Sequence, residues 1–185
     1  LDKVPYWFFG DWAQGFKRGV PPREKDGKSA FQDLVYLIAL KEASQMEKAF
    51  GQKAFAEHYQ HIIGRLQSNL KKAYWNEEKQ LFADTYHHKS YSQHVNALAI
   101  LADVIEGEES VELMKRILDD RSITQTTVYF RYYLQRAMQK VGLGNALLQH
   151  TSIWTDQLSL GLTTWAEKPE PSRSDCHAWG ASPNI

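Results

Sequence analysis

The sequence contains one cysteine, Cys176, among 185 residues. A single thiol can form no disulfide within the chain and offers no cysteine-rich zinc cluster. The sequence also lacks an excess of either charge, because 22 Lys and Arg balance 22 Asp and Glu. This balance argues against a nucleic-acid-binding protein, which needs a basic surface, and against an anionic-lipid binder. No apolar run approaches the ~20 residues that cross a bilayer, so we expect neither a nucleic-acid partner nor a membrane span.

With 43% hydrophobic residues and six Trp, the chain can bury a sizeable core, as one domain or part of a larger one. It begins at Leu1 and ends at Ile185, just after what reads as the start of another helix. We therefore expect residues 1–185 to be a piece of a longer protein, cut at both ends. The lack of a leader segment then predicts nothing about cellular location.

Apolar residues recur at spacings of three and four along most of the chain, which predicts helices. The predicted helices cover about 30–50, 53–75, 93–106, 109–118, 127–141 and 145–160. Ser29 and Gln32 have the spacing of a capping box, and Ser92 is the expected cap of the third helix. Residues 76–85 read as a polar turn with a short hairpin.

Short connections between these helices predict consecutive antiparallel hairpins. No repeat of fixed period is found, which argues against a solenoid. The sequence therefore predicts an all-α protein, either a closed ring of hairpins or a globular bundle.

Three loops carry aromatic residues together with acids or histidine, around 6–12, 163–167 and 175–180. Such residues in interhelical loops indicate a lined cleft. Trp12, Trp165 and Trp179 each have Asp, Glu or His within two residues. Indole rings stack on the apolar faces of sugars, and polar neighbours can bind the hydroxyls. The group therefore predicts a sugar-binding site, with packing of helix ends as the alternative for each ring.

The polar residues of these loops have two interpretations each. Glu167, held beside Trp rings, would lose hydration and become a better base, or it is a solvated residue paired with Lys168. Asp11 either binds sugar hydroxyls or caps a helix entry. His177 either contacts a substrate hydroxyl, orients Glu167, or is structural.

Three histidines and an acid raise the question of a metal: His87, His88, His94 and Asp84. Their spacing fits no standard zinc pattern, so we expect no metal. Gln93 and Asn96 either face the cleft or serve as caps. The aromatic run at 129–133 is expected in the core.

The loop motifs resemble the α-L-rhamnosidases of glycoside hydrolase family 78. The motifs are Gly10-Asp11-Trp12, Thr163-Thr164-Trp165-Ala166-Glu167 and Arg173-Ser174-Asp175-Cys176-His177-Ala178-Trp179-Gly180. The resemblance implies an (α/α)6 barrel, a toroid of six helical hairpins with a pocket at one end, present here as a partial barrel. The chain would be the C-terminal part of that catalytic domain.

The family hydrolyses terminal α-L-rhamnose from glycosides and plant polysaccharides, with inversion and without a cofactor. By matched position, the resemblance makes Glu167 the general base and His177 a rhamnose-contacting residue. It places Trp12 in the −1 subsite and Asp11 in the same pocket. Trp165 and Trp179 are further candidates to hold the sugar. A periplasmic or extracellular location is plausible from the resemblance.

One feature of the family is absent from the sequence, namely the upstream Asp-Gly…Asp-Glu-Arg type motif that carries the general acid. Residues 23–27 contain the same residue types as this motif, but in a different order and at a different place in the chain. Inverting hydrolysis needs two carboxyl groups, about 6.5–9.5 Å apart. We therefore expect this chain to be inactive without the missing N-terminal half of the domain. The alternatives are a toroid glycosidase for another sugar, a non-catalytic carbohydrate-binding domain, or a helical scaffold.

Overall fold

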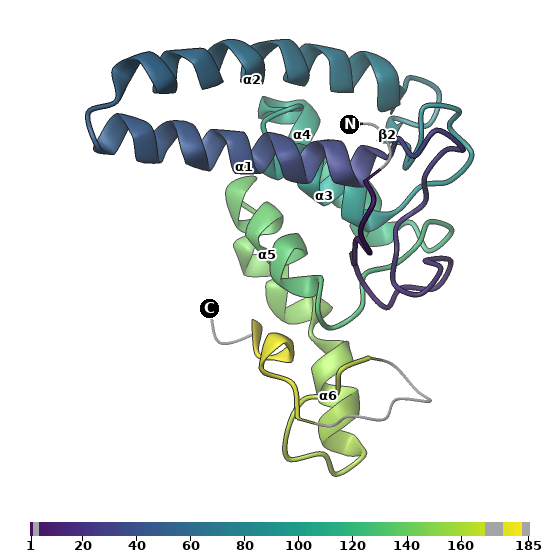
Figure 1. The fold of residues 1–185 in the computed structure, drawn as a ribbon. Coiled ribbons are helices and arrows are strands. Elements are labelled where there is room, and N and C mark those ends of the chain that lie inside the picture. Colours follow the sequence, from purple (N-terminus) through teal and green to yellow (C-terminus); the bar gives the residue numbers. More distant parts are fainter. Residues whose placement is uncertain (2–3, 169–175, 183–185) are drawn as a thin grey trace.

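A computed structural model describes residues 1, 4–168 and 176–182 (Figure 1). The α-helices are α1 (Ala30–Ala49), α2 (Lys53–Tyr74), α3 (Gln93–Leu101), α4 (Gly107–Asp119), α5 (Arg131–Lys140) and α6 (Ser152–Ser159). Two 3₁₀ helices are η1 (Gly144–His150) and η2 (Ala178–Gly180), and two short strands are β1 (Trp75–Asn76) and β2 (Leu81–Phe82). Within the described ranges, no helix has the length and apolar character needed to cross a membrane.

The helices form consecutive hairpins, and the first helices of successive hairpins, α1, α3 and α5, lie next to one another. Helix α1 packs on α2 and α3, and α3 packs on α4 and α5 (Figure 1). Every residue of α3 from 93 to 100 is buried, whereas α2 buries one stripe, at Ala56, Ile63, Leu70 and Tyr74. Helices α1, α3 and α5 are therefore an inner row, with α2 and α4 outside it. This arrangement confirms the all-α class and is that of a partial six-hairpin toroid.

Most predicted elements are confirmed. Helix α2 matches its predicted range, and β1 pairs with β2 in an antiparallel hairpin. Ser92 caps α3, since its Oγ accepts a hydrogen bond from the Val95 amide at 3.3 Å. The capping box at Ser29 is wrong, because the Ser29 hydroxyl donates instead to the Pro22 carbonyl at 2.8 Å.

The third helix is shorter than predicted and ends at Leu101 rather than near residue 106. Asp103 adopts a left-handed conformation, with φ of 57°. Its carboxylate forms ion pairs with Lys41 and Lys140, and the Gln67 amide donates to the carbonyls of residues 102 and 103. These long-range contacts hold the turn that ends the helix.

The predicted helix over 145–160 is also wrong, because the structure divides it into η1 and α6. Helix η1 fully buries none of its residues, and only Ala146 and Leu147 pack partly against the core, so tertiary packing does little to favour a regular α-helix there. The break falls at Thr151, whose hydroxyl donates to the Leu148 carbonyl at 2.8 Å.

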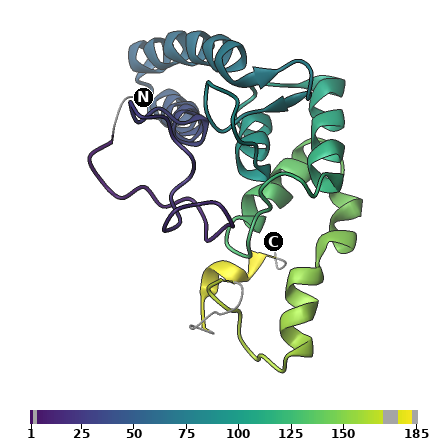
Figure 2. The ribbon, with the colours of Figure 1, turned by 90° about the vertical axis from the view of Figure 1, so that its right-hand side faces the viewer.

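The loops that precede α1, α3 and α5 gather on the side opposite the α1–α2 connection, at the right of Figure 1. Figure 2 views this loop end. The C-terminal turn reaches the same end, since the Trp179 ring lies 6.2 Å from that of Phe9 in the loop before α1. Segments from both ends of the chain therefore meet where the inner helices begin.

Candidate functional site

An aromatic cluster joins three loops at this end. The rings of Phe9 and Trp179 are nearly parallel, with an interplanar angle of 12°. Tyr129, just before α5, lies 5.5 Å from Phe9 and 5.0 Å from Trp179 between ring centroids. Trp12 packs edge-on against Phe9 at 5.1 Å. Two of the three predicted Trp residues are therefore linked through one shared neighbour.

Trp179 and His177 lie together at the C-terminal turn. Their ring centroids are 4.8 Å apart. Both residues are half-buried, and among the described residues the Trp179 Nε1 has no hydrogen-bond partner. A cavity of about 360 Å³ opens beside Trp179 and is lined on its other side by tyrosines of α5 and the turn before it. A cavity lined by aromatic rings is suited to a ligand with apolar faces.

The Glu167 turn lies against Trp12. The Lys168 ammonium sits 5.1 Å from the centroid of the Trp12 ring, within the range of a cation–π contact. Glu167 and Trp12 are both half-buried. In the part of the chain that the structure describes, Lys168 faces this ring and forms no ion pair with Glu167. The candidate base is therefore one residue from a direct contact with the candidate sugar platform.

The third tryptophan, Trp165, connects the Glu167 turn to η2. Its carbonyl accepts a hydrogen bond from the His177 amide at 3.0 Å. A Cβ on Gly180 would lie 2.6 Å from the Trp165 Cβ, so only glycine allows this approach. The Gly180 carbonyl in turn accepts from the Trp154 Nε1 of α6 at 2.6 Å. The neighbouring motif residues Arg173, Ser174 and Asp175 lie outside the described residues.

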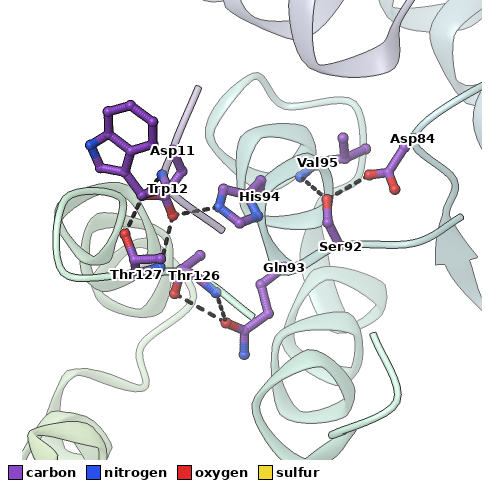
Figure 3. A network of polar contacts seen from close by, with 9 residues as sticks. All are labelled: Asp11, Trp12, Asp84, Ser92, Gln93, His94, Val95, Thr126 and Thr127. Atoms are coloured by element: carbon purple, nitrogen blue, oxygen red, sulfur yellow. Dashed lines mark hydrogen bonds and ion pairs between the residues drawn. The ribbon is translucent and has the colours of Figure 1, made fainter. Parts of the chain in front are cut away.

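Asp11 is buried next to Trp12, between His94 and Thr127, with 0% of the residue exposed (Figure 3). Its Oδ1 accepts from the Trp12 amide at 2.9 Å and from the Thr127 hydroxyl. Its Oδ2 accepts from the Thr127 amide and from the His94 Nε2, each at 2.7 Å. Hydrogen bonds to a charged group contribute about 1.5–3 kcal/mol each, which offsets the cost of burying the carboxylate. This geometry favours the capping interpretation of Asp11 over direct contact with sugar hydroxyls.

Gln93 and Asn96 also make structural contacts. The Gln93 Oε1 accepts from the Thr126 amide at 2.9 Å (Figure 3). Its Nε2 donates to the Ile117 carbonyl at 2.8 Å. Asn96 accepts from the Phe82 amide at 2.8 Å and donates to the Phe82 carbonyl at 3.0 Å. Both side chains therefore join loops to helices instead of facing a cleft.

The histidines considered for a metal site have separate partners. The His94 ring contacts Asp11, that of His88 lies 3.3 Å from the Asn76 amide, and that of His87 lies 2.8 Å from the Glu24 carboxylate. Asp84 accepts from the Ser92 hydroxyl at 2.5 Å, and burial raises the pKa of this carboxyl. Within the described ranges, no three His, Cys, Asp or Glu side chains are grouped to hold a metal ion.

The acids of residues 23–27 are likewise bound locally. Asp26 pairs with Lys28 at 3.0 Å, and hydrogen bonding to Lys28 lowers the pKa of Asp26 below its ordinary value. Both the ion pair and the pKa shift of Asp26 come from a neighbour two residues along the chain. That this segment is not the general acid stays a prediction from the order of its residues.

The sequence did not identify Tyr129 as a member of the aromatic cluster, and it placed Phe9 only within the aromatic loop 6–12. Tyr129 is half-buried and faces Trp179, whereas it was expected in the core with Phe130. Phe9 links Trp12 to Trp179. The position of Tyr129 in the chain could have indicated this role, because Tyr129 lies in the loop before α5 just as Trp12 lies in the loop before α1.

Comparisons with known proteins agree with this arrangement. The sequence matches the family model described as the bacterial alpha-L-rhamnosidase 6 hairpin glycosidase domain over residues 1–184. A structure of a rhamnosidase from Klebsiella oxytoca with rhamnose bound is similar, with a TM-score of 0.81 and 21% identity, over 99% of this chain and 36% of that one. A GH78 family rhamnosidase of Bacillus sp. GL1 gives a TM-score of 0.83 and 22% identity, over 98% of this chain and 20% of that one. No curated protein sequence matches the chain.

At these identities the two structures support the fold, and the chain spans about a third and a fifth of their lengths. The family match covers almost every residue, including all three aromatic loops. The chain therefore belongs to the bacterial α-L-rhamnosidase six-hairpin glycosidase domain family.

Proposed function

We propose that this chain is the C-terminal portion of a catalytic domain that removes terminal α-L-rhamnose from glycosides or polysaccharides with inversion. The observation that carries the proposal is the contact between Lys168 and the Trp12 ring, because it joins the Glu167 turn to the aromatic loop before α1. The family match supports a glycoside as the substrate class. Similarity to a structure with rhamnose bound supports rhamnose as the sugar.

In the proposed mechanism, Glu167 removes a proton from water as the water attacks the anomeric carbon. Trp12 and Trp179 provide apolar surfaces for the sugar ring, and His177 binds a hydroxyl. The leaving oxygen needs a proton from a second carboxyl group, about 6.5–9.5 Å from the base. We assign that acid to the N-terminal part of the domain. No step requires a metal or an organic cofactor.

The proposal predicts that Glu167→Gln lowers turnover in the complete catalytic domain by about 10²–10⁴-fold, because the amide cannot accept the proton. The measurement is hydrolysis of an aryl α-L-rhamnoside, together with rhamnose affinity by calorimetry. We expect affinity to change little, since the base acts on water.

Glu57→Gln is the matched control, because Glu57 is an exposed residue of α2, remote from the loop end. It should hydrolyse the substrate at the parent rate. Parent-like turnover by Glu167→Gln would exclude Glu167 as the base. Hydrolysis of a different aryl glycoside would indicate another toroid glycosidase, and rhamnose binding without any hydrolysis would indicate a carbohydrate-binding domain.

A further inference from the structure

We infer that Asp11 is a positioning residue, whose buried carboxylate fixes the Trp12 ring by binding donors from three segments of the loop end at once. Those segments are the loop before α1, the first turn of α3 and the entry to α5 (Figure 3). The partners are 83 and 116 residues away from Asp11 in the chain. The inference rests on the proposed function only for its consequence in catalysis.

The first step is the number of donors. Asp11 receives hydrogen bonds from the Trp12 amide, the Thr127 amide, the Thr127 hydroxyl and the His94 ring. An ionised carboxylate only accepts hydrogen bonds, so it satisfies all four donors. An amide of the same shape must place its NH₂ group against the donors on one side.

The second step is that His94 cannot easily adapt to such an amide. Its ring is buried, at 4.6 Å from that of Phe16 and 4.5 Å from that of Phe130. Among the described residues, its Nδ1 has no hydrogen-bond partner. With the proton on Nε2, the unprotonated Nδ1 needs no acceptor in this apolar slot. Moving the proton to Nδ1 would create a buried donor without an acceptor.

The third step connects the carboxylate to the ring. The Trp12 amide is bound directly to the Asp11 side chain, so Asp11 fixes the backbone from which the indole projects. The preceding backbone is held as well, because the Gly10 and Asp11 amides donate to the Gly19 carbonyl at 2.7 and 3.3 Å. The Trp12 ring therefore depends on a residue that does not itself reach a ligand.

The test uses the full-length protein that contains this chain, labelled with 5-fluorotryptophan, in which Trp12→Phe identifies the Trp12 fluorine resonance. In Asp11→Asn, we expect this resonance to shift or broaden and to become more sensitive to a soluble paramagnetic agent. The Trp75 resonance, from β1, should stay unchanged. Asp33→Asn is the matched control, because it alters another buried aspartate, which accepts from the Tyr74 hydroxyl at 2.8 Å.

A second pair of variants reads the same contact if Asp11→Asn does not fold. Thr127→Val removes one donor to Asp11 and should shift the Trp12 resonance. Thr127→Ser keeps the hydroxyl, so its Trp12 resonance should stay at the position found in the parent protein. An unchanged Trp12 resonance in folded Asp11→Asn, or in Thr127→Val, would overturn the inference. Equal changes in Asp11→Asn and Asp33→Asn would also overturn it.

Kinetics distinguish this inference from the proposed function. If the protein hydrolyses an aryl rhamnoside, Asp11→Asn should raise KM about tenfold or more, and Trp12→Ala should add little to that increase in the double variant. Fully additive effects would contradict action through Trp12. If the parent protein hydrolyses no rhamnoside, the proposed function fails, and the fluorine resonance still decides the role of Asp11.

Discussion

Asn96 shows how single buried amides organise the loop end. It lies in α3 with 0% of the residue exposed, and it binds both backbone groups of Phe82 in β2. A third hydrogen bond runs from its Nδ2 to the Ser92 carbonyl at 2.8 Å. The Asn96 side chain therefore binds the backbone of β2 as a second strand would, and it connects the β1–β2 hairpin to α3 in the inner row.

Replacing Asn96 by Leu should destabilise the protein by about 2–5 kcal/mol, because two buried backbone groups of Phe82 lose their partner. Urea unfolding of the complete catalytic domain measures this change. Asn69→Leu on α2 is the control, since Asn69 is exposed and its replacement should change stability by less than about 0.5 kcal/mol. Equal stabilities for the two variants would mean that the Phe82 contacts contribute nothing.

At the same scale, the sequence identifies residue types better than their roles. Trp12 and Glu167 stand out because each lies in a connecting loop that combines aromatic with acidic residues, and their turns do meet. The burial of Asp11 was not predictable, because its partners His94 and Thr127 come close only in the folded chain. The residues next to Asp11 in the sequence are equally compatible with a capping role and with a ligand-binding role.

At the scale of elements, the loop before α1 depends on Gly19. This residue has φ of +74°, and a Cβ here would lie 2.5 Å from the Phe9 ring. Phe9 in turn contacts Trp12 and Trp179. The shape of one turn therefore determines the position of the ring that joins the aromatic cluster.

Gly19→Ala should cost about 1–2 kcal/mol from the left-handed conformation alone, with a further loss as Phe9 moves. We expect a lower melting temperature and a changed fluorine resonance for labelled Trp12. Gly64→Ala should act in the opposite direction and stabilise by up to about 1 kcal/mol, because Gly64 lies within α2 with no atom near the added Cβ. Calorimetry of both variants measures the contrast, and a stabilised Gly19→Ala would contradict the packing described.

Helices are predictable from apolar periodicity, since each inner helix must bury a face, but their ends depend on distant contacts. Helix α3 stops early because Lys41, Gln67 and Lys140 hold the turn at Asp103. Those residues belong to three other helices. No local pattern near residue 103 encodes this stop.

At the scale of the whole molecule, the inner row of α1, α3 and α5 has unfilled apolar surface. A cavity of about 300 Å³ lies between these helices and residues 8–10, lined mostly by apolar and aromatic side chains. We propose that the rest of the six-hairpin domain completes this surface and supplies the general acid. The all-α class was predictable from the sequence, whereas the role of the site loops and the closure of the ring by other residues stay proposals.

The most direct test of the central claim is a crystal structure of the complete catalytic domain with L-rhamnose bound. The account predicts the sugar against the Trp12 ring, with His177 at a hydroxyl and the Glu167 carboxylate directed at water beside the anomeric carbon. Rhamnose bound away from Trp12, with Glu167 directed to bulk solvent, would contradict it.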